Sequence, residues 1–184
     1  MTLVASHGRP GAGKSTFTSM LAEAIAAQDC SVTVVKLGAP LYELQAHVYR
    51  AAGLSAPQPG QQDGALLNAL GQHLRRINPG ALTDTFATTV AELRHDRPDL
   101  VILCDDMRPA DTAAMRALGA VFIHVWAPDD IRHQRKDRRG DLSAGSDTHP
   151  TEGDIPDADH RVENTGSLSQ LRDRARVLAR EVLS

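Results

Sequence analysis

The sequence of 184 residues contains only two cysteines, Cys30 and Cys104. Neither has a partner at metal-ligand spacing, so we expect reduced thiols, as in a cytosolic protein. No apolar run approaches the length that spans a membrane, and nothing near the N-terminus resembles a signal peptide. These absences predict a cytoplasmic protein that has no membrane partner.

A basic excess is also missing. Lysine and arginine number 20 against 23 acidic residues, which gives a formal net charge of −3 and a pI near 6.2. Because general nucleic-acid binders usually carry a strong basic excess, we expect no nucleic-acid partner. Small anions need only a local basic patch. The length suits a single α/β domain over residues 1–184, with no second domain required.

The most informative stretch is residues 8–15, GRPGAGKS, which fills every fixed position of the phosphate-binding loop G-x-x-x-x-G-K-[ST]. It lies between a short apolar run at 3–5 and an amphipathic segment that begins at Lys14, as the motif requires. We expect Lys14 to neutralise the β and γ phosphates of a nucleotide and Ser15 to hold Mg²⁺. A glycine-rich turn without this role is the alternative, and eight matching positions in order argue against it. The predicted cofactor-binding residues are Gly8, Gly11, Ala12, Gly13, Lys14, Ser15 and Thr16.

Apolar runs that alternate with amphipathic segments predict a three-layer α/β/α sandwich, the P-loop NTPase fold, around a parallel five-stranded sheet. The strands are expected at 3–5, 31–35, 100–104, 120–126 and 160–162. Helices are expected at 14–28, from 40 to about 49 and from 63 to about 76. Another follows the break at 78–80 and runs to about 95, and three more are expected at 110–118, at 129–139 and after 167. Residues 53–62 have no apolar period and predict a loop.

Two of the expected helices carry apolar stripes that we predict to face inward. The helix that begins near Pro40 is expected to bury Leu41, Leu44 and Val48 and to present Tyr42, Gln45 and Tyr49 elsewhere. Ser167 and Gln170 form a capping box for the last helix, which is expected to bury Leu168, Leu171, Ala175, Leu178 and Val182. Consecutive helices between the second and third strands, about 39–95, form an insertion where a second substrate could be held.

Two charged segments complete the predicted site. Asp105 and Asp106 follow the buried strand 100–104, where the other half of a magnesium site is expected; an acidic turn is the alternative. The helix 129–139 carries a basic cluster and leads into a polar, glycine-containing segment, so 129–154 predicts a lid that closes over transferring phosphates. A solvated charged face is the alternative there. The cluster consists of Arg132, Arg135, Lys136, Arg138 and Arg139.

With Asp106-Met107-Arg108, the sequence begins to resemble the deoxynucleoside monophosphate kinase family of P-loop kinases. Members have a strand ending in D-x-R, an arginine-bearing lid, an H-x-x-E element and an N-x-G turn before the last helix. The corresponding residues here are Asp106-Met107-Arg108, the cluster 132–139, His149-Pro150-Thr151-Glu152 and Asn164-Thr165-Gly166. Lys36, Pro40-Leu41, the segment 66–71 and Arg75-Arg76 are similar to acceptor-side elements of the family. The resemblance covers nearly the whole chain in order.

The resemblance implies ATP and Mg²⁺ as cofactors and a nucleoside monophosphate as substrate. Asp106, or Asp105, would organise the metal, and Arg75 or Arg76 would hold the acceptor's phosphate. The implied catalytic residues are Lys14, Asp106, Arg132, Arg135 and Arg139, the metal residues Ser15, Asp105 and Asp106, and the substrate residues Lys36, Tyr42, Gln45, Gln72, Arg75, Arg76 and Arg108.

This sequence departs from the family pattern at Leu82, which replaces an aromatic residue, and at Gly64-Ala65, where an arginine is expected. Base and sugar preference therefore stay open, and a modified pyrimidine fits as well as a common one. Spacing alone assigns no role to His149 and Glu152.

The leading hypothesis is ATP-dependent phosphoryl transfer to a (deoxy)nucleoside 5'-monophosphate by a monomer or homodimer. One alternative is a small-metabolite kinase with an alcohol acceptor, in which Asp105 or Asp63 serves as the base. Another is a nucleotide-dependent switch that hydrolyses a triphosphate slowly. The sequence shows no clear guanine-reading motif, and a switch would leave the acceptor-type insertion unexplained.

Overall fold

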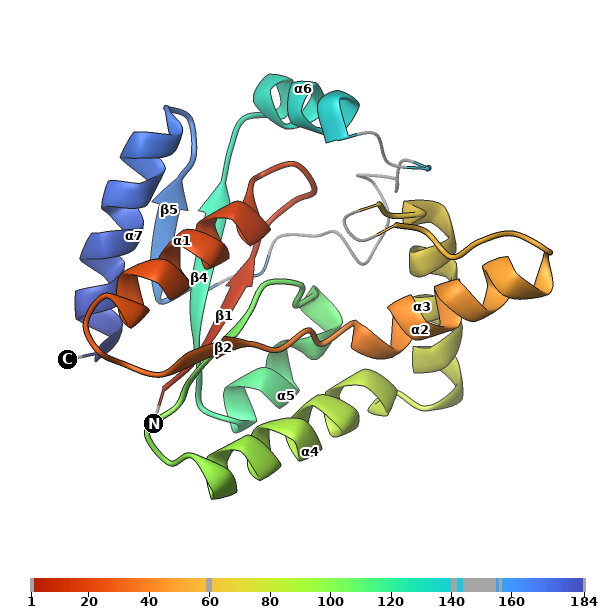
Figure 1. The fold of residues 1–184 in the computed structure, drawn as a ribbon, viewed down its shortest axis with the longest axis horizontal. Coiled ribbons are helices and arrows are strands. Elements are labelled where there is room, and N and C mark those ends of the chain that lie inside the picture. Colours follow the sequence, from red (N-terminus) through yellow and green to blue (C-terminus); the bar gives the residue numbers. More distant parts are fainter. Residues whose placement is uncertain (1, 59–60, 140–141, 144–154, 156, 184) are drawn as a thin grey trace.

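A five-stranded parallel sheet forms the centre of the chain (Figure 1). The computed structural model describes residues 2–58, 61–139, 142–143, 155 and 157–183, with only the backbone of Arg139. The strands are β1 (Leu3–His7), β2 (Val32–Val34), β3 (Val101–Cys104), β4 (Ala120–Trp126) and β5 (His160–Glu163), in the order β2-β3-β1-β4-β5. β1 is central and buried throughout, so the loop that leaves it begins in the middle of the carboxyl edge of the sheet.

The helices lie where the apolar spacing predicts them, with ends that shift by a few residues. They are α1 (Lys14–Ala26), α2 (Ala39–Ala51), α3 (Gly64–Ile77), α4 (Ala81–Asp96), the 3-10 turn η1 (Pro109–Asp111), α5 (Thr112–Ala117), α6 (Asp129–Arg139) and α7 (Leu168–Leu183). Local capping explains several of these boundaries: Pro40 lies in the first turn of α2, and the Asp63 carboxylate accepts a hydrogen bond from Leu66 N at 3.0 Å at the start of α3.

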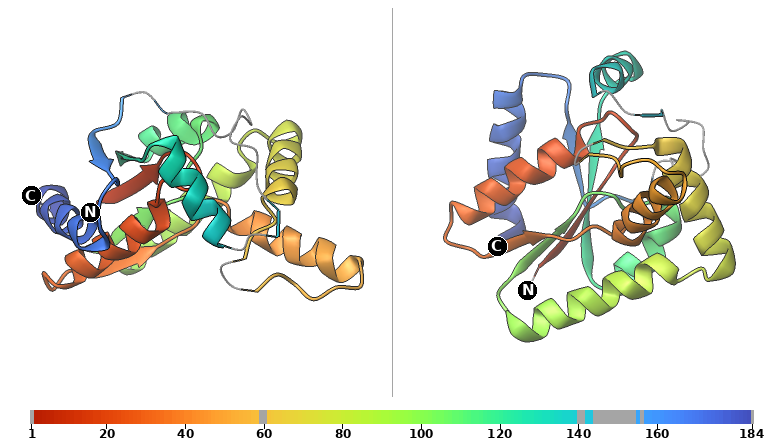
Figure 2. Two further views of the ribbon diagram at one scale, coloured as in Figure 1. Left: turned by 90° about the horizontal axis from the view of Figure 1, so that it is seen from above. Right: turned by 45° about the vertical axis from the view of Figure 1, so that its right-hand side comes forward.

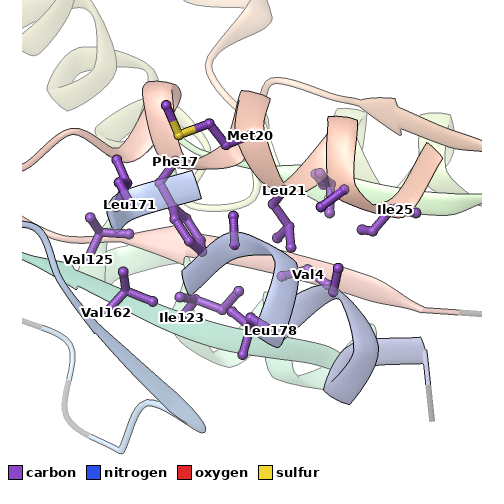
Figure 3. Packing of buried hydrophobic residues seen from close by; sticks show 14 of the residues in the cluster. Val4, Phe17, Met20, Leu21, Ile25, Ile123, Val125, Val162, Leu171 and Leu178 are labelled. Carbon is purple, nitrogen blue, oxygen red and sulfur yellow. The ribbon is translucent and has the colours of Figure 1, made fainter. Parts of the chain in front are cut away.

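Two apolar clusters give the fold its three layers. Because successive strand residues point to opposite faces, Val4 packs under α1 and α7 whereas Leu3 packs under α4 and α5. Figure 3 shows the first cluster, in which Phe17 of α1 and Leu171 of α7 meet Val125 of β4. Phe86 and Val90 of α4 and Met115 of α5 belong to the second. The predicted α/β/α sandwich with a parallel five-stranded sheet is confirmed.

The predicted inward face of α2 is wrong. Leu44 and Val48 are 36% and 42% exposed, whereas Gln45 is buried at 3%. α2 and α3 stand beside the sheet rather than on it (Figures 1 and 2), so the face of α2 that carries Leu44 and Val48 has no apolar layer to cover it. Leu41 is partly buried against the second cluster, as expected.

Leu168 is also misassigned, because it is 62% exposed. It is the first residue of α7 and lines a cavity at the carboxyl edge of the sheet, so the apolar layer over the sheet begins only with Leu171. The other expected contacts of α7 are present: Ala175 and Leu178 are buried and Val182 packs against the first cluster. In the described part of the chain, no helix is long and apolar enough to cross a membrane.

Candidate active site

Residues 8–15 form a tight loop between β1 and α1, and two of its glycines are required sterically. Gly11 and Gly13 have φ values of +80° and +93°, in the left-handed region that side chains rarely adopt. A Cβ on Gly11 would lie 2.5 Å from the carbonyl oxygen of Arg132, and one on Gly13 would lie 2.3 Å from Asn164 Nδ2. The loop is therefore clamped against the start of α6 and the turn before α7.

The N-terminus of α1 is suited to bind an anion. Its N-cap residue is Gly13, which has no side chain to accept from the first N–H groups of the helix, in contrast to Asp63 at the start of α3. Gly13, Lys14, Ser15 and Thr16 line the adjoining cavity. Lys14 Nζ donates to the carbonyl oxygen of Gly8 at 2.7 Å, which keeps its ammonium group at the loop. A helix N-terminus and a lysine at one place attract phosphate oxygens.

The cavity beside this loop has a volume of about 940 Å³ and extends to α2, α3 and α6. Among the described residues, seven lysine and arginine side chains line it, against two carboxylates. This positive cavity lies in a chain whose formal net charge is −3. The cations are Lys14, Lys36, Arg75, Arg108, Arg135, Lys136 and Arg138, and the carboxylates are Asp105 and Asp106.

The arginines of α6 divide into two groups. Arg135 lines the cavity and reaches the carbonyl oxygen of Ala12 at 3.5 Å; its burial lowers its pKa from the ordinary value. Arg132 is not among the described cavity residues, because it is buried behind the loop, donating to Pro10 O at 2.8 Å and to Asp129 at 2.8 Å. The prediction that Arg132 is a lid arginine is therefore wrong, because its side chain supports the loop from behind. Lys136 and Arg138 line the cavity in its stead, and the Arg139 side chain lies outside the described residues.

Asn164 ties the loop to this helix. Its Nδ2 donates to Ala12 O at 2.8 Å, while its carbonyl oxygen and Oδ1 accept from Arg135 Nη2 at 3.1 and 3.3 Å. Asn164 is buried, so these bonds are shielded from water. The sequence signalled the residue only through the N-x-G turn, and spacing gave it no role.

The two carboxylates after β3 are held differently. Asp106 accepts from the N–H groups of Leu37 and Gly38, each at 2.9 Å, and from the Cys104 thiol at 3.3 Å. Burial raises the pKa of that thiol, and the charge of Asp106 raises it further, so the thiol remains protonated. Asp105 is buried in an ion pair with Lys36.

The Lys36 pKa is set by opposing effects. Burial alone lowers it, but the hydrogen bond and charge of Asp105 and the charge of Asp106 outweigh this, and the net shift is upward. Lys36 is therefore a cation at neutral pH.

Oxygen ligands suited to Mg²⁺ share this cavity. The Ser15 hydroxyl and the carboxylates of Asp105 and Asp106 all line it. Among the described residues, no group of three or more His, Cys, Asp or Glu side chains forms a metal cage. Mg²⁺ commonly takes one or two carboxylates together with phosphates and water, so the donor set fits a magnesium nucleotide.

Of the predicted acceptor residues on α3, only Arg75 lines the cavity. Its Nε and Nη2 donate three hydrogen bonds of 2.9 to 3.3 Å to the buried carboxylate of Asp111. Asp111 also accepts from Arg108 N at 3.0 Å, and the Arg108 side chain lines the cavity too. Gln72 and Arg76 are exposed and do not belong to the described lining, because they lie on the outer face of α3. Of the two arginines, Arg75 is therefore the one that faces the cavity.

The α2 side of the cavity contains Tyr42 and Gln45, as the family resemblance implies. Gln62 donates to the Tyr42 hydroxyl at 3.2 Å, and Asp63 N donates to Gln45 Oε1 at 3.1 Å. The described part of the loop 53–62 also reaches the cavity through residues that sequence reasoning left unassigned: Pro57, Gln58, Gln61 and Gln62. The glutamines of this loop were the one feature of the sequence that could have indicated a contact with a ligand.

Most of the predicted lid after α6, including His149 and Glu152, lies outside the described residues. The described pair 142–143 crosses to the start of α3, where Gly64 N donates to Ser143 O at 3.1 Å and Leu142 N donates to Gln62 O at 3.0 Å. The Ser143 hydroxyl also donates to the Asp63 carboxylate. The chain that follows the basic helix is thus attached to the insertion.

No protein-family model matches the sequence, and no curated protein matches it significantly. Solved structures resemble the fold along its full length. The APS kinase of Mycobacterium tuberculosis, solved with AMPPNP and APS, is 15% identical, with 98% of this chain and 97% of that chain covered and a TM-score of 0.57. A gluconokinase of Sinorhizobium meliloti is 16% identical over 99% and 94%, with a TM-score of 0.56. A Thermus thermophilus protein is 24% identical over 97% of each chain, with a TM-score of 0.54. The chain therefore has the fold of P-loop kinases.

Proposed function

We propose that this chain transfers the terminal phosphoryl group of ATP, bound with Mg²⁺, to the phosphate of a (deoxy)nucleoside 5'-monophosphate. The observation that carries the proposal is that two groups of chain segments supply cations to one cavity. One set, Lys14, Arg135, Lys136 and Arg138, comes from the loop and α6; the other, Lys36, Arg75 and Arg108, comes from the exit of β2, from α3 and from the segment after β3. Two sets suit two phosphorylated ligands in one cavity.

Phosphoryl transfer depends on positioning and on charge stabilisation more than on a dedicated nucleophile. The N–H groups at the start of α1 and the Lys14 ammonium would hold the triphosphate, while Arg135 lies beside the loop to stabilise charge on the transferring group. Ser15 with Asp105 or Asp106 would hold Mg²⁺, which neutralises phosphate charge. Arg75 would hold the acceptor's phosphate, whose oxygens need no protein base.

The alternative of an alcohol acceptor fits this geometry less well. Of its two candidate bases, Asp63 is not among the described cavity residues, because its carboxylate caps α3 and accepts hydrogen bonds from Tyr49 and Ser143. Asp105 does line the cavity but is paired with Lys36. The neighbours include an APS kinase and a gluconokinase, so the fold admits acceptors of different kinds. A switch protein would leave the part of the cavity that α2 and α3 line without a ligand.

The test is a coupled ADP-release assay with ATP and Mg²⁺ against a panel of ribo- and deoxyribonucleoside monophosphates, with Lys14→Ala as the blank. We expect one or a few monophosphates to be turned over and the blank to be silent. Turnover of a non-nucleotide alcohol, with every monophosphate silent, would refute the proposal. Asp63→Asn helps to separate the two chemistries: it should leave kcat unchanged for a phosphate acceptor, whereas loss of the base for an alcohol acceptor would lower kcat and remove the acid limb of its pH profile.

A further inference from the structure

A second cavity, with a volume of about 290 Å³, lies between α1 and α7. The two helices lie side by side on one face of the sheet, where both contribute to the first apolar cluster (Figure 1). The cavity shares no described lining residue with the active-site cavity, so it is a separate site. Its chemistry depends on Met20, Glu23 and Ala24 of α1 and on Arg172, Arg176 and Arg180 of α7, which we call the α1/α7 groove. We propose that this groove binds a small polyphosphate, an anion in which several phosphate groups are linked in a chain.

The three arginines form a row along α7. They recur every four residues, so they lie near one side of the helix, and neighbours are separated by about 6 Å along its axis. The row therefore extends over about 12 Å from Arg172 to Arg180. Each guanidinium can donate two parallel N–H groups to a phosphate. A row of this length suits a ligand whose negative charges are spread along a chain, rather than an ion with a single charged centre.

Most of this positive charge is available to a ligand. No described residue forms an ion pair or a hydrogen bond with Arg172 or Arg180. Arg176 donates to Asp173 at 3.2 Å, but the two side chains are 61% and 64% exposed, so the pair contributes little and a ligand can replace it. Among the described lining residues, Glu23 is the one carboxylate, and the C-terminal end of α1 adds about half a negative charge. The groove therefore stays positive.

The inner wall of the groove is apolar. Met20 and Ala24 are 6% and 9% exposed and belong to the first apolar cluster, whereas the arginines are exposed at the outside. A wall of low polarity beside charges of one sign strengthens their attraction for an anion. The volume lies close to the lower limit of small-molecule sites, about 300 Å³, so the groove suits a short chain of phosphates.

Calorimetric titration of the full chain with inorganic tripolyphosphate tests the proposal. The parent protein is Lys14→Ala, because the phosphate loop of the wild type also attracts polyphosphates. Relative to this parent, we expect Arg176→Gln to weaken binding several-fold, and replacement of Arg172, Arg176 and Arg180 together by Gln to weaken it by at least about 10-fold. Arg174→Gln is the matched control on the same helix. Arg174 is also exposed but is not among the described lining residues, so its replacement is expected to leave the affinity unchanged.

Glu23→Gln tests the same inference in the opposite direction. It removes a negative charge from the groove and is expected to tighten the binding of tripolyphosphate by about 2- to 5-fold. A gain of affinity cannot result from a poorly folded variant, and thermal unfolding checks that the arginine variants are folded. Equal affinities in the parent, the triple variant and Glu23→Gln would overturn the proposal.

A comparison of ligands identifies the source of the polyphosphate. Equal affinities for tripolyphosphate and ATP, both weakened in the triple variant, would show that the groove recognises the phosphate chain alone. Tighter binding of ATP would indicate a nucleoside triphosphate whose base contacts Met20 and Ala24, and both results support the proposal. A single-stranded oligonucleotide that binds more tightly than either ligand, and loses this advantage in the triple variant, would overturn it in favour of nucleic acid. None of these results bears on phosphoryl transfer, which the ADP-release assay tests separately.

Discussion

We expect Arg75 and Asp111, which form an ion pair at the proposed acceptor site, to show a large coupling free energy in a double-mutant cycle. We consider Arg75→Met, Asp111→Leu and the double variant, which replace the charges by apolar side chains. The Asp111 side chain is 2% exposed and receives three hydrogen bonds from Arg75, whose own side chain is 15% exposed at the cavity. Removal of either partner therefore strands a charge with little access to water.

The expected losses of unfolding free energy differ because the Arg75 side chain is more exposed than that of Asp111. Arg75→Met leaves a carboxylate with only Arg108 N as donor, for which we expect a loss of roughly 3–4 kcal/mol of unfolding free energy. Asp111→Leu leaves a guanidinium that still reaches cavity water, so about 2–3 kcal/mol is expected. The double variant strands no charge and leaves Arg108 N unpaired, at a cost of roughly 1–2 kcal/mol. The coupling free energy, which is the sum of the two single losses minus the loss in the double variant, is then about 3–6 kcal/mol.

Urea unfolding of the four proteins measures this coupling, and the Arg116 and Asp159 pair supplies a control cycle. Its side chains are 37% and 40% exposed, so its coupling is expected to stay below about 1 kcal/mol. The double variant should remain folded but lose affinity for the acceptor, seen as a rise in acceptor KM of about 100-fold with ATP binding unchanged. Additive losses in the Arg75 cycle, or an unaffected acceptor KM in the double variant, would refute the reasoning.

Three further outcomes are expected. Asn164→Ala removes the bond to Ala12 O and should cost roughly 1–2 kcal/mol in urea unfolding while weakening the binding of an ATP analogue in calorimetry; unchanged binding would contradict its role as a tie. Gly13→Ala should abolish nucleotide binding, because its Cβ would meet Asn164 Nδ2 at 2.3 Å with φ at +93°, whereas retained binding would show that the loop relaxes freely. The Ser143 hydroxyl, as the largest influence, holds the pKa of Asp63 below its ordinary value, so its stabilisation is complete above about pH 4 and is lost as pH falls through the lower folded pKa. Ser143→Ala should reduce this loss in acid unfolding, and an identical pH profile would contradict it.

Much of the fold was predictable because it depends on short-range spacing. The run GRPGAGKS, the buried strand before Asp105 and the helical period of 14–28 each encode a local structure within a few residues. Parallel strands joined by helices then place the loop and the carboxylates at one edge of the sheet. The phosphate loop, the two aspartates and Arg135 accordingly meet in one cavity, as the sequence indicates.

What spacing leaves open is which neighbour covers a given face. Helical period groups Leu44 with Val48, yet only the position of α2 beside the sheet decides that this face meets water and that Gln45 is buried. Spacing likewise does not decide which of Arg75 and Arg76 faces the cavity. The sequence reveals the charge of Arg132, but its position behind the loop depends on its contacts with Pro10 and Asp129.

The sequence by itself determined the parallel sheet, the phosphate loop and the supply of cations, since each follows from residue types at fixed local spacing. The tertiary structure alone decided which side chains face the cavity, and that Asp105 and Asp106 are held by Lys36 and the backbone at 37–38. The physical reason is that burial and hydrogen bonding are relations between segments far apart in the chain, which no local pattern specifies.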